Sequence, residues 1–503
     1  MAKCELQREA INFLLSKESL MRRLGVRKRV GSMTKRKHTP SAQKLRRDLT
    51  GGKRGDGHRR RQAVRRPDPR KIRIAKTDAA LTSVAGLVMF GAFLRTLGID
   101  HDLAKKFECL KHGSAVIYRM QTVLRMLLDL FLVGEHRVFG LEAVAADPLF
   151  VHLCGGVVPS LDTVYRDLAR FDDESIAALE EMTALHGLEE LRRRRGRLRV
   201  VHLDIDTTVE PVFGEHEGAL PGPNPHYHGR PSYHPVLARI AETDTCVGAR
   251  LRPGDTSFGA AEVPLIECWI DRTRNVAGPD CLMYVRIDGA ADCADVMSAI
   301  DHKGCFFLTK ARMTPDLCGA VATASHWTTV DRDADGRPLR QVAIIDFARS
   351  EWRQRSLPVR VIAMRTLDRI NGKQIYLWED YDYTVQVFLT NDFVSAPEDL
   401  AQKYNERAGI EPLIAEFKSA WGIGKVPSAS FVANHAALLL KLLTHNLLRR
   451  YVVERVKDVP QLRSWRAAWL RRALILIPGR LSHSGRTWEL HLPPRPALMP
   501  LLN

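Results

Sequence analysis

Three features are missing from this sequence: a long apolar run, a metal-binding cysteine pattern, and enough acidic residues to balance the basic ones. No stretch reaches the roughly 18 consecutive apolar residues that a membrane-spanning helix needs, so no such helix is predicted. The opening residues are polar and predict no signal peptide. We therefore expect a protein without a membrane partner.

The nine cysteines follow no repeating pattern. They form no C-x-x-C pair and, with the histidines, no cluster that has zinc-finger spacing, so a structural zinc site is not predicted. Scattered cysteines in a chain of 503 residues are typical of reduced thiols. The sequence therefore predicts a cytoplasmic location.

The charge imbalance is large, with 76 lysines and arginines against 58 aspartates and glutamates and a formal net charge of +18. Such an excess favours a polyanionic partner, nucleic acid first, although ribosome-associated and membrane-surface proteins share it. Residues 1–75 are rich in basic runs and glycine and have few large apolar residues. They are predicted to form a largely disordered arm that clamps DNA non-specifically, with a solubilising tail as the alternative.

The hydrophobic periodicity changes along the chain and predicts an α/β protein built from several parts. Residues 76–197 show the spacing of helices and predict a helical DNA-binding domain. Residues 198–311 follow the order of three strands, helix, strand, helix, strand, and together with residues 390–460 they predict the core. Residues 312–389 predict a mostly β insertion, and residues 461–503 a C-terminal helix and tail.

One stretch, residues 404–418, places four polar side chains on one predicted helix face: Tyr404, Arg407, Glu411 and Lys418. At about 100° per residue they fall within an arc of roughly 60°. A solvated face with an Arg–Glu pair one turn apart would explain this pattern. The alternative is a carboxylate placed for a metal ion, with flanking cations that bind phosphate. Pro412 restricts the backbone of the residue before it, which predicts that the helix kinks or restarts there.

Two predicted strands end in aspartates. Asp204 and Asp206 lie on the same face of the strand within 198–209, so periodicity cannot choose between them. Asp288 ends the predicted strand 281–288, where a buried charge is costly unless it is paired or metal-bound. A strand-end turn for the first pair and a helix cap for Asp288 are the structural alternatives.

Taken together, these motifs resemble those of bacterial insertion-sequence transposases of the DDE cut-and-paste type. The resemblance rests on the spacing Tyr-x2-Arg-x3-Glu-x6-Lys in residues 404–418, on Asp-Thr-Thr at 206–208, and on Arg-Ile-Asp-Gly at 286–289. The loop 214–235, rich in Gly, Pro and His, resembles one subgroup of that family. The resemblance implies a ribonuclease-H-like catalytic domain with a β insertion, and it favours Asp206 over Asp204.

The resemblance also implies the chemistry. Three carboxylates would bind two Mg²⁺ or Mn²⁺ ions: Asp206, Asp288 and Glu411. Three other side chains would contact the DNA: Tyr404, Arg407 and Lys418. The protein would cleave the terminal inverted repeats of its own element and join the 3′-hydroxyls to target DNA, as a homodimer or larger oligomer. Two alternatives stay open: a DNA-binding descendant without turnover, and a nuclease of the same fold that cleaves without joining.

Overall fold

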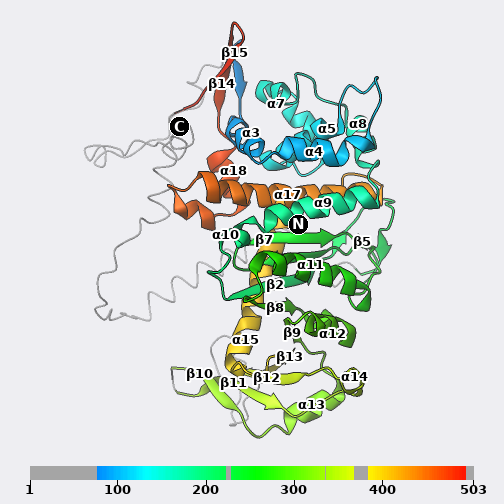
Figure 1. Cartoon of the computed structure of the whole chain (residues 1–503), viewed down its shortest axis with the longest axis vertical. Helices are drawn as coiled ribbons and strands as arrows, with labels where there is room; N and C mark the ends of the chain where they lie inside the picture. The colour runs from blue at the N-terminus through cyan, green and yellow to red at the C-terminus, as the bar shows by residue number, and fades with distance from the viewer. Residues whose placement is uncertain (1–75, 223–227, 335, 368–382, 494–503) are drawn as a thin grey trace, which may run out of the picture. The chain divides into compact units, whose positions relative to one another are not determined.

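The computed structural model describes residues 76–222, 228–334, 336–367 and 383–493 (Figure 1). All of them belong to the larger of two compact units, Asp48–Asn503. The predicted basic arm, residues 1–75, lies outside the described residues.

The core is a mixed sheet of nine strands in the order β10-β11-β12-β13-β9-β8-β2-β6-β7. Neighbours pair antiparallel except at the centre, where β8 lies parallel to both β2 and β9. The bounds are β2 Val200–Thr207, β6 Val236–Ile240, β7 Thr245–Arg250, β8 Leu282–Ile287, β9 Phe306–Lys310, β10 Thr328–Arg332, β11 Pro338–Ile345, β12 Arg360–Leu367 and β13 Tyr383–Thr390. This arrangement agrees with the predicted α/β class.

Helices supply the connections that parallel strands require. The helix α11 (Val263–Ala277) joins β7 to β8, and α12 (Ala294–His302) joins β8 to β9. Both bury one apolar stripe against the sheet, where Trp269 and Ile300 are each almost fully buried. The strands β2 and β8 thereby lie side by side, with Asp206 near the end of β2 and Asp288 directly after β8.

The helix α17 (Phe431–Arg455) is buried on nearly all sides. It packs against α9 (Asp173–Gly187), against α5 (Met120–Val133) and against strand β7 (Figure 1). Its buried side chains are leucines and alanines together with polar residues such as Lys441 and Asn446, and α17 links the central sheet to the helices of the N-terminal part.

The described part of the predicted helical region is helical apart from one strand. Its helices are α3 Gly86–Thr96, α4 Ile99–Phe107, η3 Glu108–Leu110, α5, η4 Val138–Gly140, α6 Leu141–Val144, α7 Pro148–Leu153, α8 Leu161–Leu168, α9 and α10 Glu189–Arg193. The strand β1 (Ala80–Thr82) pairs with β14 (Gly479–Ser484), which also pairs with β15 (Thr487–His491). Local periodicity could not reveal β1, because its partner lies about four hundred residues away in the chain.

The strands of residues 312–389 extend the core sheet. β13 pairs antiparallel with β9, with Phe388 opposite Lys310, and β12, β11 and β10 follow outward. Short helices accompany them, α13 (Pro315–Ala322) and α14 (Ser350–Gln354). The predicted C-terminal helix from Leu462 to Leu476 is divided, because η10 (Pro460–Ser464) ends before α18 (Ala467–Leu474) begins. Among the described helices, none is long and apolar enough to cross a membrane.

Candidate active site

The two aspartate-bearing strands end at the same edge of the sheet. Asp204 on β2 lies opposite Arg286 on β8, and the parallel register brings Asp206 level with Asp288 two residues later. Buried apolar residues of β2, β6 and β8 pack around this position, so the ends of β2 and β8 are rigidly held. The register thus places both candidate carboxylates at one point.

The helix that carries the third carboxylate is broken, as Pro412 predicted. α15 (Pro397–Glu406) ends, a single 3₁₀ turn follows at Arg407–Gly409, and α16 (Ile410–Glu416) restarts. Pro412 is the third residue of α16, within the first turn, where a missing backbone N–H costs little. Glu411 therefore lies at a helix start rather than in a helix interior.

Five of the predicted site residues line one open cleft of about 450 Å³. They are Asp206, Asp288, Tyr404, Arg407 and Glu411, together with Gly289, Lys310, Gln386, Asn405 and Ala408. The cleft joins the ends of β2 and β8 to the break between α15 and α16. Lys418, the sixth predicted residue, is not among the described residues that line it.

Asp206 is the most constrained carboxylate in the cleft. Its Oδ1 accepts from the Thr207 N–H at 2.9 Å and lies 3.0 Å from Nη2 of Arg407, which is itself buried. Burial raises the pKa of Asp206 to about 6; Arg407 opposes the rise, and the nearby carboxylates of Asp288 and Glu411 add to it. One arginine therefore only partly offsets the negative charge that the fold places here.

Asp204 has a different environment, although it lies two residues away on the same face of β2. Its side chain is fully buried, and Arg286 holds both carboxylate oxygens, at 2.6 and 3.0 Å. Arg286 also donates to the Lys403 carbonyl oxygen at the end of α15, and Arg239 lies 3.8 Å from Asp204. This closed pair ties β2 and β8 to α15, and it leaves Asp204 no oxygen facing the cleft.

The turn after β8 is held by a second buried ion pair. Asp288 accepts from the Ala290 N–H at 3.0 Å, so the capping alternative is realised around a 3₁₀ turn while Asp288 also lines the cleft. Asp292 then binds Arg349 through two hydrogen bonds of 2.6 and 2.8 Å. Arg349 comes from the region between β11 and α14, so the outer strands help to fix the Asp288 turn.

Lys418 lies on a π-helical segment, Phe417–Trp421, that follows α16. Its Nζ is 3.1 Å from the Val209 carbonyl oxygen and 3.3 Å from Glu210, just after β2. Two buried cations anchor the end of this segment: Lys441 donates to the Gly422 carbonyl oxygen at 2.6 Å, and Arg471 donates to the Ala420 carbonyl oxygen. Burial lowers the pKa of Lys441 to about 7.

Comparison with known proteins identifies the family. The model of the family described as Transposase DDE domain group 1 matches residues 64–502, most of the chain. The chain belongs to the DDE transposases. A search of curated proteins returned no match. Among solved structures, a piggyBac transposase in a synaptic complex with hairpin DNA is similar at 12% identity, over 79% of this chain and 82% of that chain, with a TM-score of 0.36.

Membership of this transposase family implies a dependence on divalent metal ions. The donors in the cleft suit one, because carboxylate oxygens are the ligands that Mg²⁺ and Mn²⁺ prefer, and because the three carboxylates of the cleft outnumber its two cations, Arg407 and Lys310. Within the described ranges, no three Asp, Glu, His or Cys side chains are drawn together tightly enough to form a metal cage. Arg407 lies where a cation would neutralise Asp206.

Sequence reasoning missed the residues that support the transposase cleft. Arg286 stood inside a motif that the resemblance used, but nothing indicated that it would hold Asp204. Asp292 and Arg349 gave no signal, because the two residues lie far apart in the chain, whereas Lys441 stood out only as a lysine within an apolar helical stretch. Only buried charge at unexpected positions could have pointed to them.

Proposed function

We propose that this protein is an active DNA transposase that cleaves the ends of its own element and joins the 3′-hydroxyls to target DNA. The observation that carries the proposal is the convergence of Asp206, Asp288 and Glu411 on one cleft in a chain of this family. We place the reaction in the cytoplasm, in a homodimer or larger assembly on double-stranded DNA. The proposed parts of the chain are a basic arm (1–75), a helical DNA-binding domain (76–197), a catalytic core (198–311 and 390–460), a β-rich insertion (312–389) and a C-terminal helix and tail (461–503).

Each residue has a role that its position supports. Asp206, Asp288 and Glu411 would hold the divalent ions, which supply charge neutralisation at the attacking and leaving oxygens of the phosphodiester. Arg407 lies buried against Asp206 and would move to a DNA phosphate when a cation takes its place. Tyr404 lines the cleft beside it, and burial raises the pKa of its phenol to about 12, so it stays a neutral hydrogen-bond donor. Lys418 would bind the backbone outside the cleft.

The proposal is tested with DNA duplexes that carry the sequences bordering the coding region. Purified protein with Mg²⁺ should nick these duplexes at a defined end and join the 3′-hydroxyl to a second duplex. Cleavage without joined product would favour the nuclease, and binding without cleavage would favour a descendant that has lost turnover. The variants Asp206→Asn, Asp288→Asn and Glu411→Gln serve as matched inactive controls.

A further inference from the structure

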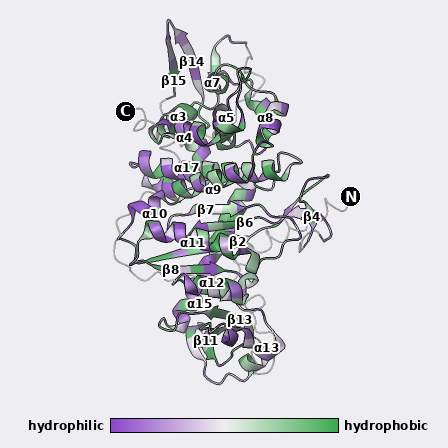
Figure 2. Cartoon of the chain, turned by 45° about the vertical axis from the view of Figure 1, so that its right-hand side comes forward, coloured by the Kyte–Doolittle hydropathy of each residue, from purple (hydrophilic) through white to green (hydrophobic). Residues whose placement is uncertain are grey.

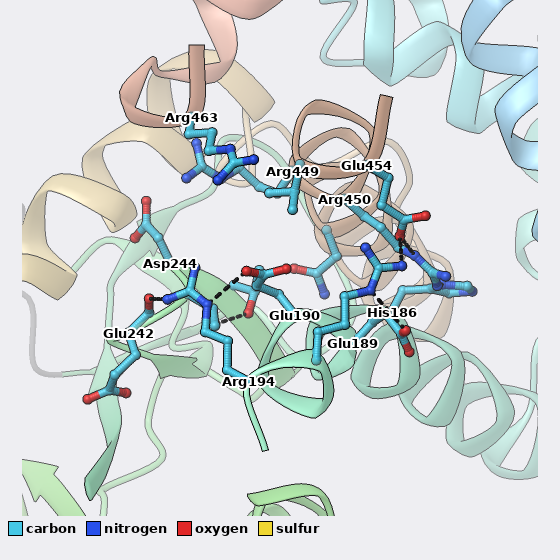
Figure 3. A pocket seen from close by; sticks show the side chains of 15 residues that line it. His186, Glu189, Glu190, Arg194, Glu242, Asp244, Arg449, Arg450, Glu454 and Arg463 are labelled. Carbon is cyan, nitrogen blue, oxygen red and sulfur yellow. Dashed lines mark hydrogen bonds and ion pairs between the residues drawn. The ribbon is translucent and has the colours of Figure 1, made fainter. Parts of the chain in front are cut away.

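A second pocket lies at the opposite end of the central sheet from the carboxylate cleft. It encloses about 180 Å³ between α9, α10, the turn from β6 to β7, α17 and η10 (Figure 3). The turn adjoins the start of β2, because the Ala241 N–H donates to the His202 carbonyl oxygen at 3.1 Å. At about 3.3 Å per residue, the pocket is therefore roughly 13 Å or more from Asp206 along the strand.

The pocket carries five arginines: Arg193, Arg194, Arg449, Arg450 and Arg463. Its carboxylates are already engaged. Glu190 lies 2.8 Å from Arg194, and Glu454 lies 2.6 Å from Arg193 and also pairs with Arg450. The others point to partners of their own: Glu189 to Arg192 and Arg193, Glu242 to His202, and Asp244 to Arg239.

Two guanidinium groups of the pocket, those of Arg449 and Arg463, form no ion pair with a described carboxylate, although the charge of Arg449 acts on Glu416. Arg449 donates to the Trp465 carbonyl oxygen at 3.1 Å, and neither Arg449 nor Arg463 makes an ion pair within the part of the chain that is described. They reach over the pocket from α17 and η10 (Figure 3). A further donor is His186, which is 4% exposed. Arg450 donates to its Nδ1, and its Nε2 has no hydrogen-bond partner in the described ranges.

The surface beside the pocket is basic as well. Five arginines from the end of α10 to the start of β2 are exposed: Arg192, Arg193, Arg195, Arg197 and Arg199. Figure 2 shows α10 in the hydrophilic colour, in contrast to the apolar strands beside it. Arginine forks match the geometry of phosphate oxygens, and a pocket of this volume has room for phosphate oxygens, since one water occupies about 30 Å³.

We propose that this pocket and the basic segment 192–199 bind the phosphate backbone of double-stranded DNA, as a contact separate from the carboxylate cleft. The inference rests on the proposed function for its choice of DNA as the polyanion. Arg449 and Arg463 would each contact a phosphate, and the exposed arginines of the segment 192–199 would add positive charge beside the pocket. The path of the DNA would then extend from the cleft to the far end of the sheet.

The test is equilibrium binding of full-length protein to a blunt DNA duplex in EDTA, where no cleavage occurs, over a series of salt concentrations. The variant Arg449→Ala/Arg463→Ala should bind more weakly, and the slope of log Kd against log salt should fall by about 2, one for each lost phosphate contact. Arg353→Ala/Arg486→Ala removes two exposed arginines elsewhere and should leave the slope nearly unchanged. Since Arg463 is exposed, Arg463→Glu repeats the test without risk to folding.

Equal slopes for the pocket variant and its charge-matched control would overturn the proposal. Binding of inorganic phosphate or a free nucleotide in the pocket, with duplex binding unaffected, would also overturn it, because the pocket would then be a site for a small anion. Failure of the proposed function gives a different result: Asp206→Asn would leave cleavage intact, whereas the binding slopes, measured without metal, would still report on the pocket.

Discussion

Two aspartates on one face of strand β2 have opposite fates. Asp204 is fully buried, and both of its oxygens are held by Arg286. Asp206 lies only two residues further on, lines an open cleft, and faces the charges of Asp288 and Glu411 with one arginine to offset them. A carboxylate whose charge is satisfied within the protein holds the fold together, whereas one left under-compensated is available to a metal ion.

The largest expected effect comes from the carboxylates that line the open cleft. Asp206→Asn, Asp288→Asn and Glu411→Gln should each reduce strand cleavage by about 10³-fold or more, roughly 4 kcal/mol of transition-state stabilisation. Gel assays of cleavage and filter binding of end DNA give both readouts. Duplex affinity should change little. If cleavage survives in any of the three variants, that residue is not a catalytic ligand.

Disrupting the closed Asp204–Arg286 pair should change the stability of the fold. Asp204→Ala leaves the buried Arg286 guanidinium unpaired and should lower the free energy of unfolding by about 3–5 kcal/mol, as removal of one partner of a buried pair does. Denaturant unfolding measures it. The double variant Asp204→Leu/Arg286→Met should recover much of the loss. A single variant as stable as the wild type, but inactive, would move Asp204 into the catalytic group.

Burial raises the pKa of both aspartates, but Arg286 closes Asp204 off, so the pH response that a metal ion can modulate is that of Asp206. Its folded pKa of about 6 lies above the ordinary value, so the fold gains stability from its protonated form at low pH. That stability should be lost as pH rises through about 6, by on the order of 1–3 kcal/mol in metal-free buffer. Asp206→Asn should flatten this decline, and divalent ions should counteract it above pH 6. Thermal unfolding between pH 4 and 8 would show both.

The smallest effect concerns Lys418, an exposed lysine that pairs with the buried carboxylate of Glu210. Because the ammonium group is exposed and Glu210 also lies near Lys441 and Lys425, Lys418→Ala should lower the free energy of unfolding by only about 1 kcal/mol. Its effect should lie in DNA binding, with the salt slope reduced by about 1. An unchanged slope would restrict Lys418 to its contacts with Val209 and Glu210.

Periodicity predicted the two strands that carry the site, since β2 and β8 lie within the expected ranges 198–209 and 281–288. The break at Pro412 followed from backbone sterics alone. What could not be predicted depends on distant partners. β1 needs β14, and Asp204 becomes structural only because Arg286 reaches it across the sheet. Lys418 lies outside the cleft because it belongs to a π-helical segment, and residue spacing does not predict such a segment.

The most direct test of the proposed metal site is a crystal structure of the protein with Mn²⁺, using the anomalous signal to locate the ion. We predict Mn²⁺ bound to Asp206 and Asp288, with the Arg407 guanidinium displaced from Asp206 and the Asp204–Arg286 pair unchanged. Manganese at Asp204, or an intact Arg407–Asp206 pair with no ion in the cleft at saturating Mn²⁺, would contradict it.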